Sequence, residues 1–101
     1  MNEKEYFTTS MNEAATMLSC NEFDADYHAI LPPTRGDRCR FVIKLYIDSD
    51  AQLQEFARDY TNGNIMVPVK KYDEKMNDLR DILNRFKSSL QFQEAVKNNR
   101  G

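Results

Sequence analysis

Residues 38–47 read RCRFVIKLYI, and this stretch decides the predicted fold. Apolar side chains occupy every second position, and the positions between them are mostly charged or aromatic. A period of two predicts a β-strand with one buried face and one exposed face. The buried set is expected to be Cys39, Phe41, Ile43, Leu45 and Ile47. The exposed set is expected to be Arg38, Arg40, Val42, Lys44 and Tyr46.

Two shorter strands are expected to join this central strand. Residues 26–31 (DYHAIL) read as a strand that stops at the two prolines that follow it. The segment PPTRGD then supplies a turn, in which Gly36 is free to adopt a positive φ. Residues 65–69 again alternate apolar side chains and predict a third strand. Pro68 lacks an N–H, which places that strand at an edge of the sheet.

Helices are predicted from capping patterns and from periodicity. A Ser-x-x-Glu capping box at Ser10 predicts a helix over residues 11–20, and a Ser-x-x-Gln pattern at Ser49 predicts a second helix. Between residues 73 and 97 the apolar side chains recur at helical spacing, which predicts one long amphipathic helix. The apolar stripe of that helix consists of Met76, Leu79, Leu83, Phe86 and Leu90.

The expected order is therefore α-β-β-α-β-α, in a single domain over residues 1–101 whose ends, 1–8 and 98–101, fray. The simplest architecture for this order is α+β: a two-layer sandwich with a three-stranded mixed sheet, helices on one face, and a long C-terminal helix. The residues expected in the core are Phe41, Ile43, Leu45, Leu53, Phe56 and Val67.

The composition is typical of a globular intracellular protein. Hydrophobic residues make up 41% and charged residues 30%, which suits a packed core rather than a disordered chain. No apolar run approaches the roughly 18 residues of a membrane span. The opening MNEKEYFTTS lacks the apolar region of a signal peptide. We therefore expect a cytoplasmic protein with no membrane association, in which Cys20 and Cys39 are buried free thiols.

The sequence shows no pattern of residues that would indicate a catalytic site. His28 is the only histidine, and it falls inside a predicted strand. The three glycines are isolated, so no glycine-rich phosphate loop can be written. Two cysteines and one histidine are too few for a structural zinc site, which needs four ligands. We therefore expect a protein that is not an enzyme and that carries no cofactor or metal.

The exposed side of the central strand predicts a basic surface. Basic side chains beside an aromatic side chain are typical of sheets that bind nucleic acid. The same basic side chains could instead contact an acidic protein or only face solvent. The tripeptide RGD at the turn is expected to be only a turn, because adhesion would need an extracellular protein. The candidate residues for binding a partner or nucleic acid are Arg35, Arg38, Arg40, Lys44, Tyr46 and Lys70.

Protein contact is the predicted mode of action. The net charge of −2 and the pI near 5.4 argue against a dedicated nucleic-acid binder, which is usually basic. We expect a small binding or regulatory module that contacts another protein. Two alternatives stay open: a nucleic-acid-binding module that uses the basic sheet face, or an inhibitor whose acidic patch occupies a nucleic-acid-binding protein. That patch would draw on Glu13, Glu22, Asp24, Asp26, Asp48, Asp50, Glu55 and Asp59.

Self-association is expected through the C-terminal helix. A helix of the predicted length spans about 37 Å, whereas a short strand spans roughly 20 Å. Its distal half should therefore overhang the sheet. Apolar side chains there need cover, and the same helix of a second copy is the nearest candidate by symmetry. The expected homodimer contact consists of Phe86, Leu90 and Phe92.

Overall fold

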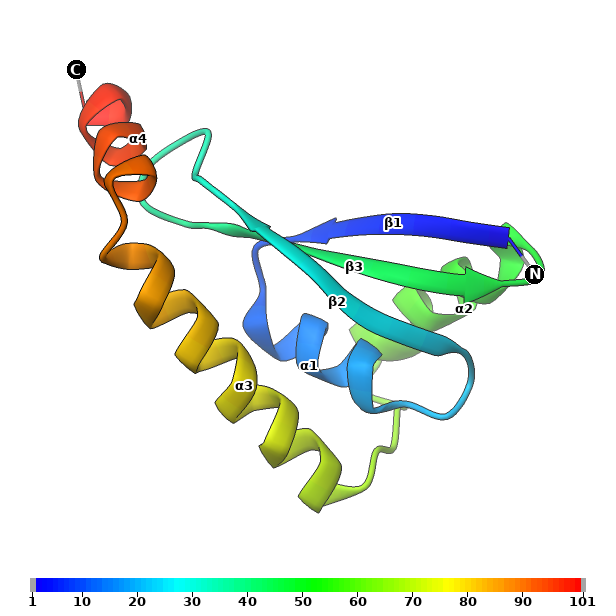
Figure 1. The fold of residues 1–101 in the computed structure, drawn as a ribbon. Helices are drawn as coiled ribbons and strands as arrows, with labels where there is room; N and C mark the ends of the chain where they lie inside the picture. Colours follow the sequence, from blue (N-terminus) through cyan, green and yellow to red (C-terminus); the bar gives the residue numbers. More distant parts are fainter. Residues whose placement is uncertain (1, 101) are drawn as a thin grey trace.

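The computed structural model describes residues 2–100, which form an antiparallel sheet of three strands and four helices (Figure 1). The strands are β1 (Asn2–Thr8), β2 (Asp24–Leu31) and β3 (Arg40–Ile47). The helices are α1 (Met11–Ser19), α2 (Asp50–Thr61), α3 (Val69–Lys87) and α4 (Leu90–Arg100). The strand order is β1-β3-β2, so β1 and β2 are the edges. Figure 1 shows α1, α2 and α3 on one side of the sheet.

The predicted central strand is confirmed as β3, and its alternation builds the core. The residues of β3 that face the helices are at most 2% exposed: Phe41, Ile43, Leu45 and Ile47. Phe56 of α2 is buried against them, while Leu53 and Val67 are partly buried at the margin of the same core. The expected α+β class is therefore confirmed.

The third strand is β1, not the segment 65–69. β1 pairs antiparallel with β3 from Asn2↔Ile47 to Thr8↔Phe41, so the sheet is antiparallel rather than mixed. The sequence pattern missed β1 because an edge strand needs few apolar residues, and only Tyr6 of β1 packs against the core. Residues 2–8 therefore lie in the sheet where a frayed end was expected. The observed order is β-α-β-β-α-α-α.

The long helix near the C-terminus is confirmed as α3, but it ends at Lys87 instead of continuing to residue 97. Ser89 explains the break. Its hydroxyl donates to the carbonyl of Phe86 at 2.6 Å and accepts from the amide of Phe92 at 3.2 Å. One serine thus closes α3 and caps α4, because its side chain competes with helical backbone bonds. No helix within residues 2–100 is long and apolar enough to cross a membrane.

Helix α1 is buried between the sheet and α3, because it contacts all three strands and α3 packs mainly on it. Small side chains allow this close approach: Ala14, Ala15 and Ser19 are fully buried. The Ser19 hydroxyl donates to the Ala15 carbonyl at 2.6 Å, which satisfies it inside the core. The predicted cap is confirmed, since the Ser10 hydroxyl accepts from the Glu13 amide at 3.1 Å.

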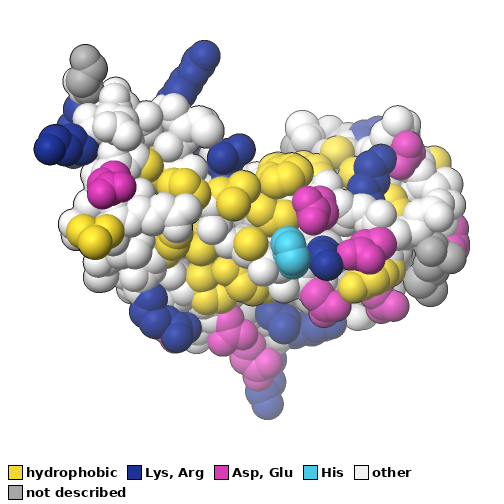
Figure 2. Space-filling model, turned by 45° about the horizontal axis from the view of Figure 1, so that its top comes forward, with side chains coloured by type: hydrophobic (Ala, Val, Ile, Leu, Met, Phe, Trp, Pro, Cys, Tyr) yellow, Lys and Arg dark blue, Asp and Glu magenta, His cyan; other side chains and the backbone are white. Residues whose placement is uncertain are grey.

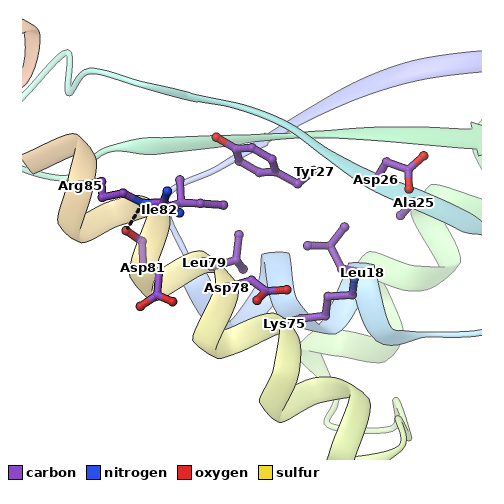
Figure 3. Close-up of a pocket in the computed structure, with 10 residues that line it drawn as sticks. All are labelled: Leu18, Ala25, Asp26, Tyr27, Lys75, Asp78, Leu79, Asp81, Ile82 and Arg85. Carbon is purple, nitrogen blue, oxygen red and sulfur yellow. Dashed lines mark hydrogen bonds between the residues drawn. The ribbon is translucent and has the colours of Figure 1, made fainter.

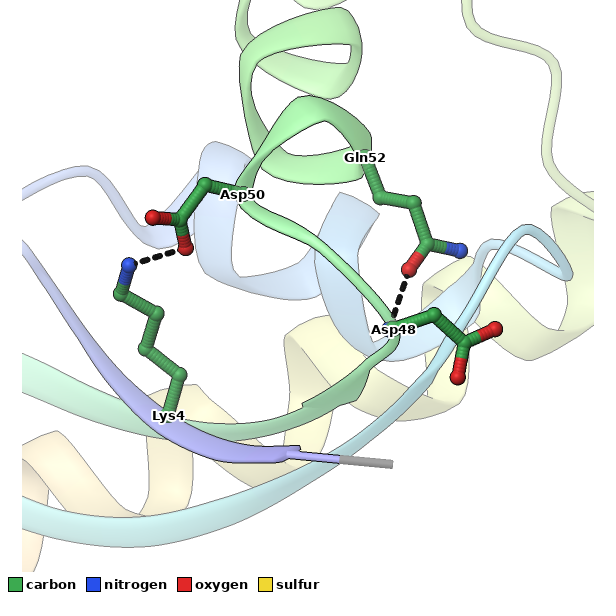
Figure 4. Close-up of polar contacts among 4 residues, drawn as sticks. All are labelled: Lys4, Asp48, Asp50 and Gln52. Carbon is green, nitrogen blue, oxygen red and sulfur yellow. Dashed lines mark hydrogen bonds and ion pairs between the residues drawn. The ribbon is translucent and has the colours of Figure 1, made fainter.

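The start of α2 differs from its predicted capping box. Ser49 occupies the N-cap position, but its side chain makes no capping bond. Instead, the Gln52 side chain accepts from the amide of Asp48 at 2.6 Å (Figure 4). An ion pair from Lys4 of β1 to Asp50 joins the edge strand to the first turn of α2.

Candidate functional site

One face of the sheet is turned away from α1, α2 and α3, and we call it the open face. Residues that are paired across neighbouring strands lie on the same face of the sheet. The register therefore places alternate residues of β1 and β2 beside Lys44 and Tyr46 on the open face. The His28 ring reaches the same face at a β-bulge, with its Nε2 3.8 Å from Oε1 of Glu5. The other members of the open face are Glu3, Glu5, Phe7, Asp24, Asp26, Ala29, Leu31, Arg40 and Val42.

The half of the open face around Lys44 is acidic. Lys44 Nζ lies 2.9 Å from Oε1 of Glu3, and Glu5 and Asp26 are its direct neighbours on the two edge strands. The pKa of Lys44 is raised, first by the hydrogen bond to Glu3 and then by the charge of that carboxylate. In Figure 2 the histidine (cyan) lies among acidic side chains, with apolar side chains beside them. The cation predicted to bind a partner is thus paired within its own sheet.

The other half of the open face is apolar. Phe7 on β1 and Ala29 on β2 stand on either side of Val42. Val42 is only 2% exposed although it points away from the helices, while Phe7 is 51% exposed. An aromatic ring at the surface beside a buried aliphatic residue, next to a charged border, is typical of a protein-contact surface.

The remaining predicted binding residues do not gather on this face. Lys70 lies exposed in the first turn of α3, on the helical side of the molecule. Arg35 and Arg38 are exposed in the loop that precedes β3. Arg38 lines a small cavity with Phe41, Leu83 and Lys87, again on the helical side. The six residues predicted to form one basic surface are therefore spread over both sides of the fold.

Arg40 and Tyr46 do lie on the open face, at opposite ends of β3. Tyr46 is half-buried opposite Glu3 and Asp24. Arg40 is half-buried opposite Leu31, and its Nε is buried without a hydrogen-bond partner among the described residues. Only this end of the face therefore retains an unpaired cationic group.

The RGD segment forms the predicted turn. Gly36 has φ of 60°, a conformation that favours glycine. The Asn99 side chain of α4 donates to the carbonyls of Pro33 and Gly36, at 3.1 and 3.0 Å. The loop is thus tied to α4 by its backbone.

The predicted dimer residues lie where α3 meets α4. The rings of Phe86 and Phe92 pack edge-to-face across the break, with centroids 6.1 Å apart. Leu90 begins α4 and is 74% exposed. The break at Ser89 thus pairs the two phenylalanines within one chain and leaves Leu90 as the exposed apolar residue.

The groups that could carry catalysis are dispersed or buried. Cys20 and Cys39 are both free and buried, as predicted, and burial is the main cause that raises the pKa of each thiol. A thiol with a raised pKa stays protonated and is a poor nucleophile. His28 is beyond hydrogen-bond distance of Glu5. Among residues 2–100 no three His, Cys, Asp or Glu side chains are grouped to hold a metal ion.

A groove of about 310 Å³ lies on the helical side, between β2 and α3 (Figure 3). Sequence patterns did not indicate it, because its residues come from segments far apart in the chain. Its lining comprises Leu18, Ala25, Asp26, Tyr27, Lys75, Asp78, Leu79, Asp81, Ile82 and Arg85.

Comparison with protein-family models, with curated proteins and with solved structures finds no match to this chain. Function is therefore inferred from the residues of the open face.

Proposed function

We propose that this chain is a small, non-enzymatic regulatory module that binds another protein through the open face. The observation that carries this proposal is the division of that face into an apolar half at Phe7 and an acidic half around Lys44. An exposed ring can anchor a partner, and the charged border can select it. The two buried free thiols suit a reducing compartment, so we place the protein in the cytoplasm.

The partner that fits this face is a basic protein surface. Lys44 is surrounded by carboxylates on both neighbouring strands, so the acidic half carries a net negative charge. Opposite charge on the partner would steer encounter and fix its orientation. A nucleic-acid-binding protein offers such a surface, and the acidic half would then compete with nucleic acid for it. The carboxylates concerned are Glu3, Glu5, Asp24 and Asp26.

Direct nucleic-acid binding is the alternative. Arg40 favours it, because its guanidinium makes no ion pair among the described residues and an arginine on this face could donate to a phosphate. The carboxylates beside Lys44 oppose it, because they would repel a phosphate backbone over half of the same face.

Site-specific photo-cross-linking tests the proposal. A photoreactive phenylalanine analogue replaces Phe7 on the open face or, as the control, Met66, which is 94% exposed in the loop before α3. The proposal predicts discrete protein adducts from position 7 in cell extract, none from position 66, and loss of the adducts when Glu5→Lys is added. Identical adducts from both positions, or adducts to nucleic acid at position 7, would contradict it.

We further propose that the chain forms a homodimer through α4. Leu90 supports this, because a side chain of that size standing 74% exposed leaves apolar surface that a second copy could cover.

A further inference from the structure

Helix α4 is attached to the rest of the fold by weak packing. None of its residues is buried, and its main neighbour among the helices and strands is α3. Figure 1 shows it beyond the end of α3, beside the loop that joins β2 to β3. A helix of only 11 residues is marginally stable by itself in water, so α4 depends on the contacts that dock it.

Specific contacts dock α4 near both of its ends. Near its start, the ring of Phe92 packs edge-to-face on Phe86 of α3. Near its end, the Asn99 side-chain amide donates to the carbonyls of Pro33 and Gly36, at 3.1 and 3.0 Å. Both acceptors belong to the backbone of the loop between β2 and β3. The tie between α4 and this loop therefore depends on the donor of one side chain.

The loop that α4 holds also forms part of the wall of a cavity. Asp37, Arg38 and Cys39 follow directly after Gly36, whose carbonyl accepts from α4. These three residues line a cavity of about 170 Å³, together with Leu83 of α3. Cys39 is only 4% exposed. The cover over this thiol thus includes a segment whose position depends on α4.

We propose that α4 is a latch, a helix that docks on this loop and leaves it while the sheet and α1 stay folded. Local opening of this kind is typical of segments with little buried surface. The break between α3 and α4 serves as the hinge. Docked, α4 holds the loop in place beside the cavity. Released, it frees the loop and opens Cys39 to solvent.

Alkylation of the two buried cysteines measures the released state. Iodoacetamide reacts with an accessible thiolate, and mass spectrometry of peptides gives separate rates for Cys39 and Cys20. Cys20 lies at the end of α1 and is 5% exposed, so release of α4 leaves it covered. Unfolding of the whole chain would expose both thiols. Cys20 is therefore an internal control for folding.

Two variants separate the latch from a general effect of charge. Asn99→Asp removes the donor at nearly constant size, because a carboxylate only accepts hydrogen bonds. Asn98→Asp places the same charge on an exposed neighbour that makes neither of the two bonds to the loop. Both changes add a negative charge to the last turn of α4, so the effect of the helix dipole is shared.

We expect Asn99→Asp to speed alkylation of Cys39 at least about fivefold and to leave Cys20 unchanged, since two hydrogen bonds no longer favour the docked state. Asn98→Asp should change either rate less than about twofold. Hydrogen exchange should also quicken in Asn99→Asp, at α4 and at the loop together.

Two results would overturn the proposal: equal rates for Cys39 in the two variants, or an equal rise at Cys20 and Cys39 in Asn99→Asp, which would indicate unfolding of the whole chain. The test is independent of the open-face proposal, because Asn99 lies on α4 and Cys39 on the helical side of the sheet.

Discussion

Lys44 Nζ lies 2.9 Å from Oε1 of Glu3, so the lysine at the centre of the open face is paired with a carboxylate of the edge strand β1. This contact changes the character of the surface predicted from β3 alone. A strand that looked basic in the sequence has acidic neighbours on both sides once β1 and β2 are in register. The proposal of a basic protein partner follows from this pairing.

The caps of α1 and α2 should differ in their contribution to stability. Ser10→Ala removes a hydroxyl that accepts from the Glu13 amide, so we expect a loss of about 1 kcal/mol in the free energy of unfolding. Ser49→Ala removes no capping bond and should cost less than about 0.5 kcal/mol. Urea unfolding of the two variants measures both values. Equal losses would contradict the assignment of the caps.

Close packing of α1 should make it intolerant of larger side chains. Ala15 is fully buried between the sheet and α3, so Ala15→Leu should cost about 1–3 kcal/mol by overpacking. Ala57 is exposed on α2, and Ala57→Leu provides the matched control with a change within about 0.5 kcal/mol. Thermal unfolding compares the two. A stable Ala15→Leu variant would mean that the core has spare room beside α1.

Alkaline pH should destabilise the fold through Tyr6. Burial, followed by the nearby Glu13 carboxylate, raises the pKa of Tyr6 to about 12 from 10.0. The unfolded chain then loses this proton at a lower pH than the folded protein. The contribution of Tyr6 is therefore complete below pH 10 and is lost as the pH rises towards 12. Burial also raises the pKa of Cys20 and of Cys39, so both thiols contribute to the loss of stability at alkaline pH. Their contribution begins to fall at a lower pH than that of Tyr6, because a thiol ordinarily ionises at a lower pH than a phenol.

Denaturant unfolding at several pH values, with a reductant present, checks this prediction. Tyr6→Phe should show a shallower decline of the unfolding free energy between pH 10 and 12 than the unchanged chain. An unaltered slope would assign the alkaline loss to other groups.

Self-association should depend on α4. We expect sedimentation equilibrium at micromolar concentration to show a dimer, and Leu90→Glu to convert it to a monomer by placing a charge in an apolar contact. Met66→Glu changes an even more exposed apolar residue on another part of the surface and should leave the dimer intact. A monomeric mass for the unchanged chain would end the dimer proposal.

The core was readable from sequence because β3 alternates strictly and is central. Every second residue from Phe41 to Ile47 must be buried when strands flank it and helices cover one side. β1 was not readable, because an edge strand with Glu3 and Glu5 on the open side resembles a polar terminus. The break at Ser89 could not be predicted either, because apolar side chains recur at helical spacing on both sides of it. The hydrogen bonds of the Ser89 side chain mark the break.

The candidate site was only partly predictable for the same reason. The sequence located Lys44, Arg40 and Tyr46 on one strand face, which the structure bears out. Their neighbours depend on register and strand order, which set whether a lysine meets another cation or a carboxylate. Asp78 and Arg85 become part of a groove only because α3 crosses beside β2.

The most direct measurement of the central claim is an equilibrium titration at low and moderate salt. One arm uses the protein captured at position 7, and the other uses labelled single- and double-stranded oligonucleotides. We predict salt-sensitive binding of the protein partner, weakened about tenfold by Glu5→Lys and little changed by Glu94→Lys on α4, with no oligonucleotide binding even at low salt. Salt-sensitive oligonucleotide binding that weakens in Arg38→Glu and Arg40→Glu variants would contradict the account.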